Sequence, residues 1–526
     1  MKKIPFFLSL LSMIVLLSVN VGAEESSTPR FEIKRFLLEG NTLLSSDKVA
    51  ALLAPGVGKE RDFADVQQTI ERLEQAYRSS GYTLTAVILP EQELSRGEVR
   101  LQVIEPRLKE IKIEGNQHFS NDNVLASLPT LKVGATPLVS AISENLRAAN
   151  ENPFRKLTLQ FTALENPEEL KAALQVKDQK PWRVALSGDN TGTSQSGYYR
   201  AGLSLQHGNL FGLDHIAILQ YTTSPDHFDK VKTVSGSYRL PIYRLGDSLD
   251  LFGAYSDSDS TLSQQGLDMK INGRGVIGGF RYNLNLPRSG GYEQKLVVGM
   301  DYRQYDNTLK DGETDLLPDV VAHPFGLTYS GSWQGDALTF DIYGSVLHNE
   351  PWGGQGQRRD FALQPRSPKS NYWIFRYGFN KMLRLPLDFM IRVGGNGQYT
   401  PDKLIPGEML GLGGATTVRG YEEREESWDA GFSGSVETYT PDFAALMGIP
   451  HTQFRLLAFF DGGVGYNLRP SGDDPTSNSL KSVGAGFRLG FGEYFSFTLD
   501  WGYALDPSLQ TRRGGNAIHF KGQLAY

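Results

Sequence analysis

Residues 483–503, VGAGFRLGFGEYFSFTLDWGY, contain two segments in which apolar side chains alternate with polar or very small ones. One phase holds Val483, Ala485, Phe487, Leu489, Phe491 and then Phe495, Phe497, Leu499, Trp501, Tyr503; the other holds Gly484, Gly486, Arg488, Gly490 and then Ser496, Thr498, Asp500, Gly502. Because successive side chains of a strand point to opposite faces, each segment predicts a strand with one apolar face. Membrane barrels use such strands, with lipid outside and water or packed polar groups inside.

The same period of two begins at Lys180-Pro181-Trp182 and continues to the last residue. Near its start, Tyr199, Ala201, Leu203 and Leu205 alternate with Arg200, Gly202, Ser204 and Gln206, and at its end Phe520, Gly522, Leu524 and Tyr526 alternate with His519, Lys521, Gln523 and Ala525. A soluble β-sandwich would bury its aromatic rings and expose its charges. We therefore predict a transmembrane all-β barrel over residues 181–526. Its last strand must close onto the first, since lipid tolerates no open sheet edge.

The composition fits this class and excludes others. The 57 glycines and 40 % hydrophobic content suit a wall that needs apolar side chains on one face only. The absence of cysteine excludes disulfides and thiolate metal sites, and a net charge of −6 gives no nucleic-acid footprint. After residue 23 there is no run of roughly 18 apolar residues, so no membrane-spanning helix is predicted.

The first 23 residues have the pattern of a secretory signal peptide. Lys2 and Lys3 precede an apolar stretch from Ile4 to Val19, and Val21-Gly22-Ala23 supplies small residues for cleavage before Glu24. The alternative is an uncleaved membrane helix, but an acidic, polar segment follows at once. We predict that residues 1–23 are removed.

An internal repeat occupies the region before the barrel. Leu38-Glu39-Gly40-Asn41 recurs 75 residues later as Ile113-Glu114-Gly115-Asn116, and Ser45, Asp47, Val49 and Leu53 match Ser120, Asp122, Val124 and Leu128. Each copy predicts a strand, a Gly-Asn turn and a helix whose first serine hydroxyl caps free N–H groups.

Each copy continues with a helix and two further strands. In the first copy, Phe63, Val66, Ile70, Leu73 and Tyr77 recur at helical spacing, before strands at Thr83–Leu89 and Glu98–Ile104. In the second copy, a helix with Leu138, Ile142 and Leu146 precedes strands at Leu157–Leu164 and Leu170–Val176. We predict two α+β modules of order β-α-α-β-β, at residues 31–105 and 106–178.

These modules resemble POTRA domains, and the chain as a whole is similar to haemolysin secretion/activation proteins, the outer-membrane translocators of two-partner secretion. The resemblance rests on Gly40-Asn41-Thr42-Leu43-Leu44-Ser45, Ser80-Gly81-Tyr82-Thr83, Leu89-Pro90-Glu91-Gln92-Glu93-Leu94, Gly97–Glu105, Asn152-Pro153-Phe154-Arg155, and Asp189-Asn190-Thr191-Gly192 with Gly197. It implies a 16-stranded antiparallel barrel behind two POTRA domains. Residues 181–526 give about 22 residues for each strand with its connection, which fits strands of ~9–11 residues, although fourteen or eighteen strands would also fit.

Two further motifs carry the resemblance into the barrel. Val418-Arg419-Gly420-Tyr421 looks like the VRGY tip of a loop that folds back into the barrel in this superfamily. Phe459, Asp461 and Gly463 match the F-x-D-x-G motif of the inner wall, which implies that Arg419 pairs with Asp461. An arginine–carboxylate pair is directional, as such an anchor requires, and Gly411, Gly413 and Gly414 would let the loop pack closely. The alternative is a glycine-rich surface loop with an exposed arginine.

The resemblance also implies partners. The main one is a large secreted exoprotein, a haemolysin or adhesin with an N-terminal secretion domain, which the POTRA domains recognise unfolded in the periplasm. The barrel lies in outer-membrane lipid, and the terminal strand with Phe520, Leu524 and Tyr526 is the signal for the barrel-assembly machinery. Relatives often carry a plug helix, but only Glu24–Arg30 precedes the first strand here, so we expect the plug to be absent or reduced to a short tail. We expect no cofactor, metal, catalytic residue or nucleic-acid partner.

Three alternatives remain from the sequence. A Bam-type insertase would share the architecture but usually carries three or more POTRA modules, and a porin would not explain the modules. A barrel enzyme would need a catalytic grouping, and no Ser/His/Asp set or His-Glu-x-x-His motif is visible. Gly411-Leu412-Gly413-Gly414 lacks the Lys-Ser/Thr of a phosphate-binding loop, and Ser256–Ser260 lacks the EF-hand pattern. The identity and activation of the exoprotein, the oligomeric state and the gating remain open.

Overall fold

The computed structural model describes residues 30–93, 96–193, 196–257, 260–264, 267–271, 274–306, 310–311, 314–315, 318–470 and 474–526. The predicted signal peptide and the segment to residue 29, where a plug helix was not expected, lie outside the described residues. The chain divides into two compact units, Met1–Arg107 with Glu165–Glu169, and Leu108–Leu164 with Leu170–Tyr526. None of the helices in the described ranges is long and apolar enough to cross a membrane.

The first module is a small α+β fold. Its elements are β1 (Phe31–Ile33), β2 (Arg35–Glu39), α1 (Ser46–Leu53), a 3-10 helix (Ala54–Gly56), β3 (Gly58–Arg61), α2 (Phe63–Ser79), β4 (Ala86–Ile88) and β5 (Glu98–Ile104). β5 pairs in parallel with β2 and antiparallel with β4. Val66, Ile70, Leu73 and Tyr77 of α2 join the buried core of this module, as their helical spacing predicted, but Phe63 is exposed. β4 is shorter than predicted because the chain still turns after Gly81, where φ is +90°.

The second module repeats the order β2-α1-α2-β4-β5 of the first, without counterparts of β1 and β3. It contains β6 (Arg107–Glu114), α3 (Asn121–Ala126), α4 (Val139–Ala149), β7 (Arg155–Ala163) and β8 (Glu169–Asp178), with β8 in the centre of a three-stranded sheet. The predicted serine cap forms only here, where Ser120 Oγ accepts the Asn123 N–H at 3.2 Å. Ser45 precedes α1 but makes no side-chain capping bond. In both modules the helix thus starts right after the matched serine, but only Ser120 makes the capping hydrogen bond.

The repeated Gly-Asn pair encodes one turn in both modules. Gly40 and Gly115 have φ of +82° and +89°, and a Cβ at either position would lie 2.4 Å from a carbonyl oxygen of the last strand. Only glycine fits such a backbone. A carboxylate that ends the last strand, Glu105 or Asp178, then accepts backbone N–H groups of the turn. These N–H groups belong to Thr42 and Leu43 in the first module, and to Gln117, His118 and Phe119 in the second.

Tyr77 adds a buried hydroxyl to the turn of the first module, where it donates to Asn41 and to Glu105 Oε1. Burial and the neighbouring Glu105 carboxylate raise the pKa of Tyr77, so this hydroxyl stays protonated and remains a donor. The helix that carries Tyr77 is thereby tied to the same turn that the glycine shapes.

The barrel follows the second module. Its strands are β9 (Trp182–Asp189), β10 (Arg200–Leu210), β11 (His215–Thr223), β12 (Lys232–Ile242), β13 (Asp247–Ser256), β16 (Gly275–Ser289), β17 (Tyr292–Tyr305), β20 (Val320–Ala322), β21 (Pro324–Gln334), β22 (Leu338–Asn349), β23 (Trp373–Arg384), β24 (Met390–Tyr399), β27 (Ala430–Tyr439), β28 (Thr452–Tyr466), β29 (Ser477–Phe491), β30 (Phe495–Ala504) and β31 (Asn516–Ala525). β20 and β21 both pair with β17 and form one broken strand. Within the described residues the barrel thus closes with sixteen antiparallel strands, which confirms the predicted fold class.

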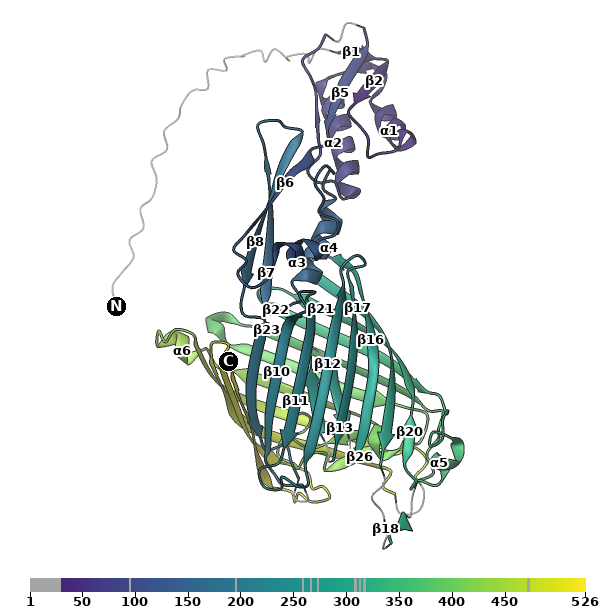
Figure 1. Ribbon diagram of the computed structural model, residues 1–526, viewed down its shortest axis with the longest axis vertical. Helices are drawn as coiled ribbons and strands as arrows, with labels where there is room; N and C mark the ends of the chain where they lie inside the picture. Colours follow the sequence, from purple (N-terminus) through teal and green to yellow (C-terminus); the bar gives the residue numbers. More distant parts are fainter. Residues whose placement is uncertain are drawn as a thin grey trace, which may run out of the picture. The chain divides into compact units, whose positions relative to one another are not determined.

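The connections lie at two rims of the barrel (Figure 1). One rim carries β14 (Ser260–Gln264), β15 (Leu267–Ile271), β18 (Lys310–Asp311), β19 (Thr314–Asp315), α5 (Arg358–Ala362) and the connection with β25 (Leu410–Leu412) and β26 (Glu426–Trp428). The other rim carries the shorter turns, with α6 (Phe443–Leu446), a 3-10 helix (Pro386–Asp388) and the chain terminus. The second module contacts the turns of this rim.

The last strand closes the barrel as predicted. β31 pairs with β9 from Lys521↔Asp189 to Ala525↔Ala185, and Tyr526 and Val184 exchange backbone hydrogen bonds of 2.8 and 2.9 Å. Beyond Asp189 the side chain of Asn190 continues the ladder. Its amide donates to Ile518 O at 2.6 Å and accepts the Phe520 N–H at 2.8 Å. The side chain of this asparagine, from the quoted Asp-Asn-Thr-Gly motif, thus adds to the 3.4 Å bond from its own backbone N–H to Phe520 O and extends the pairing of the two strands.

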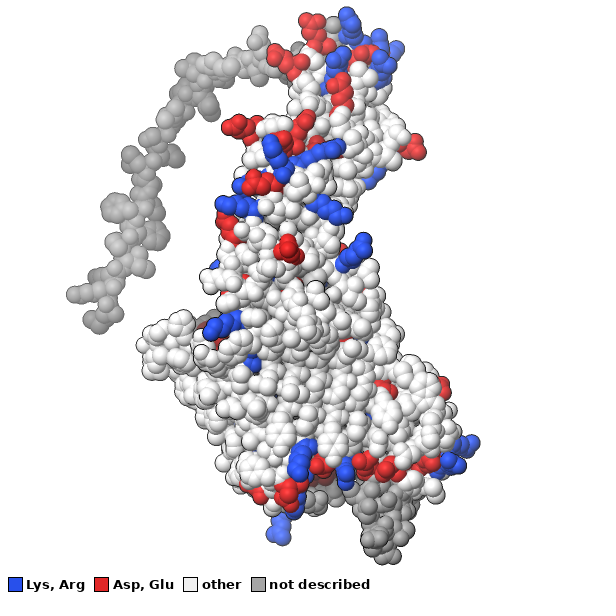
Figure 2. All heavy atoms as spheres, in the orientation of Figure 1, with Lys and Arg blue, Asp and Glu red and all other residues white. Residues whose placement is uncertain are grey.

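The two faces of the wall follow the predicted alternation. Leu203, Leu205, Trp501 and Tyr503 are exposed on the outer face, whereas Asp500 is buried on the inner one. Figure 2 shows the middle of the outer face almost free of charged side chains, with red and blue atoms gathered at the lower rim. An uncharged belt bounded by charges is the surface that a bilayer requires.

Candidate functional site

The connection between β24 and β27, residues 400–429, folds into the barrel. β25 and β26 pair as a short hairpin stem, with Leu410 opposite Trp428 and Leu412 opposite Glu426. Leu412, Val418, Tyr421 and Trp428 of this hairpin form a buried cluster with Leu480 and Ala504, which lie at the outer ends of β29 and β30. The hairpin 410–428 is therefore packed against the inner wall rather than exposed on the surface.

Arg419 at the tip of this hairpin is held by the wall. Its Nε and Nη2 donate to Asp461 Oδ2 and Oδ1 at 2.7 and 2.8 Å, and its backbone N–H donates to Asp461 at 3.1 Å. Nη2 lies 2.8 Å from Glu437 Oε1, and Nη1 lies 3.2 Å from Asp500 Oδ2. The three carboxylates come from β28, β27 and β30, so one guanidinium joins three strands.

The charges of this cluster balance. Arg488 pairs with Asp500 at 2.7 and 2.9 Å, and Arg392 lies 3.2 Å from Glu437. Three arginines thus face three carboxylates in the lumen. A buried charge costs little only when it is paired and hydrogen-bonded, and here each carboxylate has an arginine partner.

The other motif residues touch the tip as well. Arg419 Cζ lies 3.5 Å from the centre of the Phe459 ring, close enough for a cation–π contact. A Cβ at Gly463 would lie 3.0 Å from Val418 Cγ2, so this glycine makes room for the tip. The structure therefore brings together all of the residues predicted for the loop motif and the wall motif.

Tyr421 and Gly420 complete the contact. The Tyr421 hydroxyl lies 2.9 Å from Lys481 O and 2.8 Å from Asp506 O, and the Gly420 N–H donates to His519 Nε2 at 3.1 Å. Gly420 has φ of +94° and rests on Gly502 of β30, where a Cβ would lie 2.5 Å from the Gly420 nitrogen. Two facing glycines therefore set how closely the tip approaches the wall.

The base of the loop has anchors that sequence reasoning missed. Glu408 accepts hydrogen bonds from Arg303 at 2.6 and 2.8 Å, from Tyr305 at 2.9 Å and from Arg376 at 3.1 Å. Arg303 lies 105 residues from Glu408 in the chain and Arg376 lies 32 residues away, so no local spacing marks them.

Asp429, at the other end of the hairpin, is fully buried. It accepts from Arg366 at 2.8 and 3.2 Å and from the backbone N–H groups of Leu404 and Leu468 at 3.0 Å each. Gln398 of β24 then ties the two ends together, because its Nε2 donates to both Glu408 O at 2.9 Å and Asp429 O at 3.1 Å.

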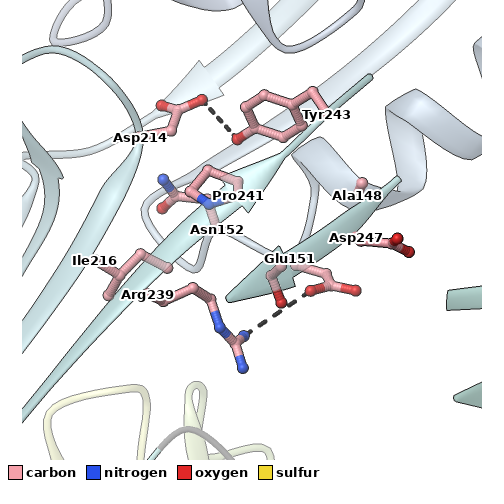
Figure 3. A pocket seen from close by; sticks show the side chains of 10 residues that line it. Ala148, Glu151, Asn152, Asp214, Ile216, Arg239, Pro241, Tyr243 and Asp247 are labelled. Atoms are coloured by element: carbon pink, nitrogen blue, oxygen red, sulfur yellow. Dashed lines mark hydrogen bonds and ion pairs between the residues drawn. The ribbon is translucent and has the colours of Figure 1, made fainter. Parts of the chain in front are cut away.

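The second module is joined to the barrel by a separate polar cluster. Arg155, the last residue of the quoted Asn-Pro-Phe-Arg motif, pairs with Asp214 in the β10–β11 turn, and both side chains are buried. Tyr243 of the β12–β13 turn donates to Asp214 Oδ2 at 2.8 Å (Figure 3). Phe154 packs over Gly208, where a Cβ would lie 2.0 Å from its ring, so this glycine is required for the contact.

Figure 3 shows the small pocket beside this joint, where Glu151 of the second module reaches Arg239 of β12. The two side chains lie 3.9 Å apart, and Glu151 also approaches Lys295 of β17 at 3.7 Å. The pocket is lined by joint residues and turns, and its chemistry is that of a packed interface.

The terminal-strand residues lie on the outer wall. Leu524 and Tyr526 are exposed, and Phe520 stacks with Phe497 at 6.4 Å. No group of three or more metal-ligating side chains occurs among the residues that the structure describes. Ser258 and Asp259 of the acidic Ser256–Ser260 stretch lie outside the described residues.

A family model described as haemolysin secretion/activation protein ShlB/FhaC/HecB matches residues 171–489, more than half of the chain. The chain belongs to this family. A second model, described as POTRA domain, ShlB-type, matches residues 31–106. The resemblance inferred from the motifs is therefore confirmed.

Two relatives of this chain are named as transporters. The heme/hemopexin transporter protein HuxB of Haemophilus influenzae is 24 % identical over 496 residues, which cover 90 % of this chain and 83 % of the relative. The outer membrane transporter CdiB of Escherichia coli O6:K15:H31 is 24 % identical over 480 residues, covering 87 % and 76 %.

Solved structures agree on the fold. CdiB from Escherichia coli superposes with a TM-score of 0.78 at 20 % identity, covering 96 % of this chain and 92 % of that one. CdiB from Acinetobacter baumannii gives 0.70 at 16 % identity, covering 95 % and 90 %. The chain is thus an outer-membrane transporter of two-partner secretion, with its POTRA region in the periplasm, and it works with a secreted exoprotein.

Proposed function

We propose that the hairpin carrying Arg419 is the gate of the export pore, and that its displacement opens the lumen to the exoprotein. The position of Arg419 carries this proposal, because its guanidinium bonds carboxylates of β27, β28 and β30 from inside the barrel. Such a tip blocks the lumen while these bonds are made. It can leave when water or the passing chain replaces them, since each partner remains on the wall.

The exoprotein is, in this proposal, a large polypeptide with an N-terminal secretion domain that arrives unfolded. The sheets of the two modules leave β2 and β4, and β6 and β7, as edge strands. An extended segment can add to such an edge through backbone hydrogen bonds, which tolerate many sequences. The second module, proposed as a POTRA domain over residues 106–178, would pass the segment on toward the barrel mouth to which Arg155 fastens it.

The remaining roles concern the envelope. Outer-membrane lipid surrounds the uncharged belt, and the barrel-assembly machinery reads the terminal strand with Phe520, Leu524 and Tyr526. Transport draws direction from folding of the exoprotein outside the cell, so the chain itself acts without a cofactor and is not an enzyme.

Replacing Arg419 by alanine tests the gate. Breaking a buried ion pair costs roughly 3–5 kcal/mol, so Arg419→Ala should unseat the tip while the sixteen-stranded wall stays folded. We expect increased conductance of the purified protein in planar bilayers, and loss of exoprotein from the medium of cells that make both proteins.

Thr416→Ala is the control on the same hairpin, since the Thr416 side chain is exposed. It should behave as wild type. Normal export and unchanged conductance of Arg419→Ala would remove the basis for a gate at this hairpin.

A further inference from the structure

The inward-folded loop is fastened in two separate places, and the two places differ in kind. The tip, residues 410–428, is fastened to β27–β31 and to the loops beside them. The base, residues 402–409, is fastened to β17, β20, β22, β23, β24 and the connection 350–372. A loop held by two different arcs of the wall does not have to move as one body.

The tip is held by polar contacts that water or a polypeptide can replace, and by a buried apolar cluster to which the wall contributes only Leu480 and Ala504. Besides Arg419, Glu425 accepts the backbone N–H groups of Gln510 and Thr511 at 2.8 and 2.6 Å. Glu426 accepts from Asn478 at 2.6 Å and from Ser508 at 2.7 Å. All of these partners lie in the chain after the loop, on the outer ends of β29–β31 and their connections.

The base is held by charges that lie beside a larger apolar cluster. Leu404, Ile405 and Met409 pack with Val320, Ala322, Leu347, Phe361, Tyr372 and Ile374, and all nine are buried. Glu408 pairs with Arg303 and Arg376, and Asp402 accepts from Lys369 at 2.5 Å. The backbone of Lys369 also donates to Lys403 O at 3.3 Å. Moving this segment would expose the apolar cluster as well as the charges.

The base and the tip meet where Gln398 bonds the two ends of the hairpin. Glu408 and Asp429 flank the hairpin stem, and the Gln398 amide joins their carbonyl oxygens. Gln398 is itself held by Arg376, whose Nε donates to its Oε1 at 2.8 Å. The stem thus enters the lumen from a clamp on β23 and β24.

We infer that Glu408, Asp429 and Gln398 form a fixed clamp, so that only the hairpin 410–428 swings during export while residues 402–409 stay in place. Glu408 is then a positioning residue of the gate. This inference rests on the proposed function and deepens it, since it assigns the moving part. It also assigns the side of the lumen that opens, which is the side lined by β27–β31.

Reversible cross-links test which part moves, because the chain has no cysteine that the reagent could attack. The base link joins Lys369→Cys to Asp402→Cys, and the tip link joins Glu425→Cys to Thr511→Cys. A short bifunctional methanethiosulfonate is applied to the full chain, and its attachment is verified by peptide mass spectrometry. Conductance in planar bilayers is recorded before and after reductant, both with the native Arg419 and in the Arg419→Ala background.

We expect the base-linked channel to open as often as the unlinked one. The tip-linked channel should stay closed, even with Arg419→Ala, until reductant is added. If the base link also closes the channel, the clamp moves and the inference is wrong, although the gate stands. If the tip link leaves openings unchanged, or if Arg419→Ala never opens, both the gate and the clamp fail.

A charge-neutral variant tests Glu408 itself. Glu408→Gln keeps the size of the side chain but removes the charge that Arg303 and Arg376 share. Combined with Arg419→Ala, it should release the base and raise single-channel conductance above that of Arg419→Ala alone, and the base link should reverse this rise. Glu422→Gln on the hairpin is the control. An unlinked Glu408→Gln channel with the conductance of its Arg419→Ala parent would contradict the clamp.

Discussion

At the scale of residues, the proposed gate depends as much on glycines, which leave room for close contact, as on charges. Arg419 reaches three carboxylates only because Gly420 lies directly on Gly502 of β30 and Val418 fits against Gly463 of β28. The bonds of a guanidinium to carboxylates depend on both their angle and their length. A methyl group that pushed the backbone of the tip away from the wall would therefore weaken all of the Arg419 bonds together.

Gly502→Ala should therefore loosen the tip. The new Cβ would lie 2.5 Å from the Gly420 nitrogen and 2.8 Å from the Arg419 carbonyl carbon, and backbone atoms cannot yield as a side-chain end can. Overpacking of this kind costs about 1–3 kcal/mol, so we expect a lower unfolding temperature in detergent and higher conductance at rest. Gly490→Ala, also on the inner face, meets its nearest atom at 3.8 Å and should change neither. Equal behaviour of the two variants would contradict the role of Gly502.

At the scale of elements, the modules and the hairpin are each set by contacts across large sequence distances. The Gly-Asn turn of each module is closed by a carboxylate from its last strand, and the second module is joined to the barrel through Arg155 and Asp214. This joint holds one end of β7 at the turns of β10–β11 and β12–β13. It fixes where a polypeptide leaving the edge of that sheet would meet the barrel.

Arg155→Ala should release the second module from the barrel rim. The change leaves the buried Asp214 carboxylate without its arginine, which costs roughly 3–5 kcal/mol. We expect faster hydrogen exchange in α3 and β7, measured by mass spectrometry on the full chain, with the barrel strands unaffected. Arg288→Ala is the control, because its 3.6 Å pair with Glu293 is exposed to solvent and is worth about 0–1 kcal/mol. Unchanged exchange in Arg155→Ala would show that other contacts hold the module.

At the scale of the whole molecule, the proposed recognition of the exoprotein belongs to the periplasmic modules and its passage belongs to the barrel. The first module has its own buried core, built from α2 and the sheet of β2, β4 and β5. The barrel closes through β9 and β31 without any strand of that module. A transporter built in this way can lose its first module and still form its wall.

Deletion of residues 31–105 should thus abolish export while the protein still inserts into the outer membrane. Insertion is measured by the heat-dependent electrophoretic mobility of a folded barrel in outer-membrane fractions, and export by the exoprotein in the medium. Export should fall to the level of cells without the transporter. Continued export after the deletion would assign recognition to another part of the chain.

Much of the site could be predicted from sequence because its residues sit in short motifs. Arg419 and Asp461 were paired on the resemblance, and the structure places their side chains in contact. Glu408, Asp429 and Gln398 could not be found in this way, since each is a single polar residue whose partners lie on strands far away in the chain. The missing cap at Ser45 could not be predicted either, because its backbone (φ −65°, ψ 148°) is almost that of Ser120 (φ −69°, ψ 157°), whose hydroxyl does cap its helix.

The sequence by itself determined the alternation of faces, the glycine turns of the two modules and the closure of the last strand onto the first. These follow from local rules, since a strand repeats every two residues, a positive φ favours glycine, and lipid excludes an open edge. The tertiary structure alone decided that sixteen strands close the barrel and that the loop is fastened at two places. Both depend on which distant strands become neighbours, and that is fixed only when the wall closes around the loop.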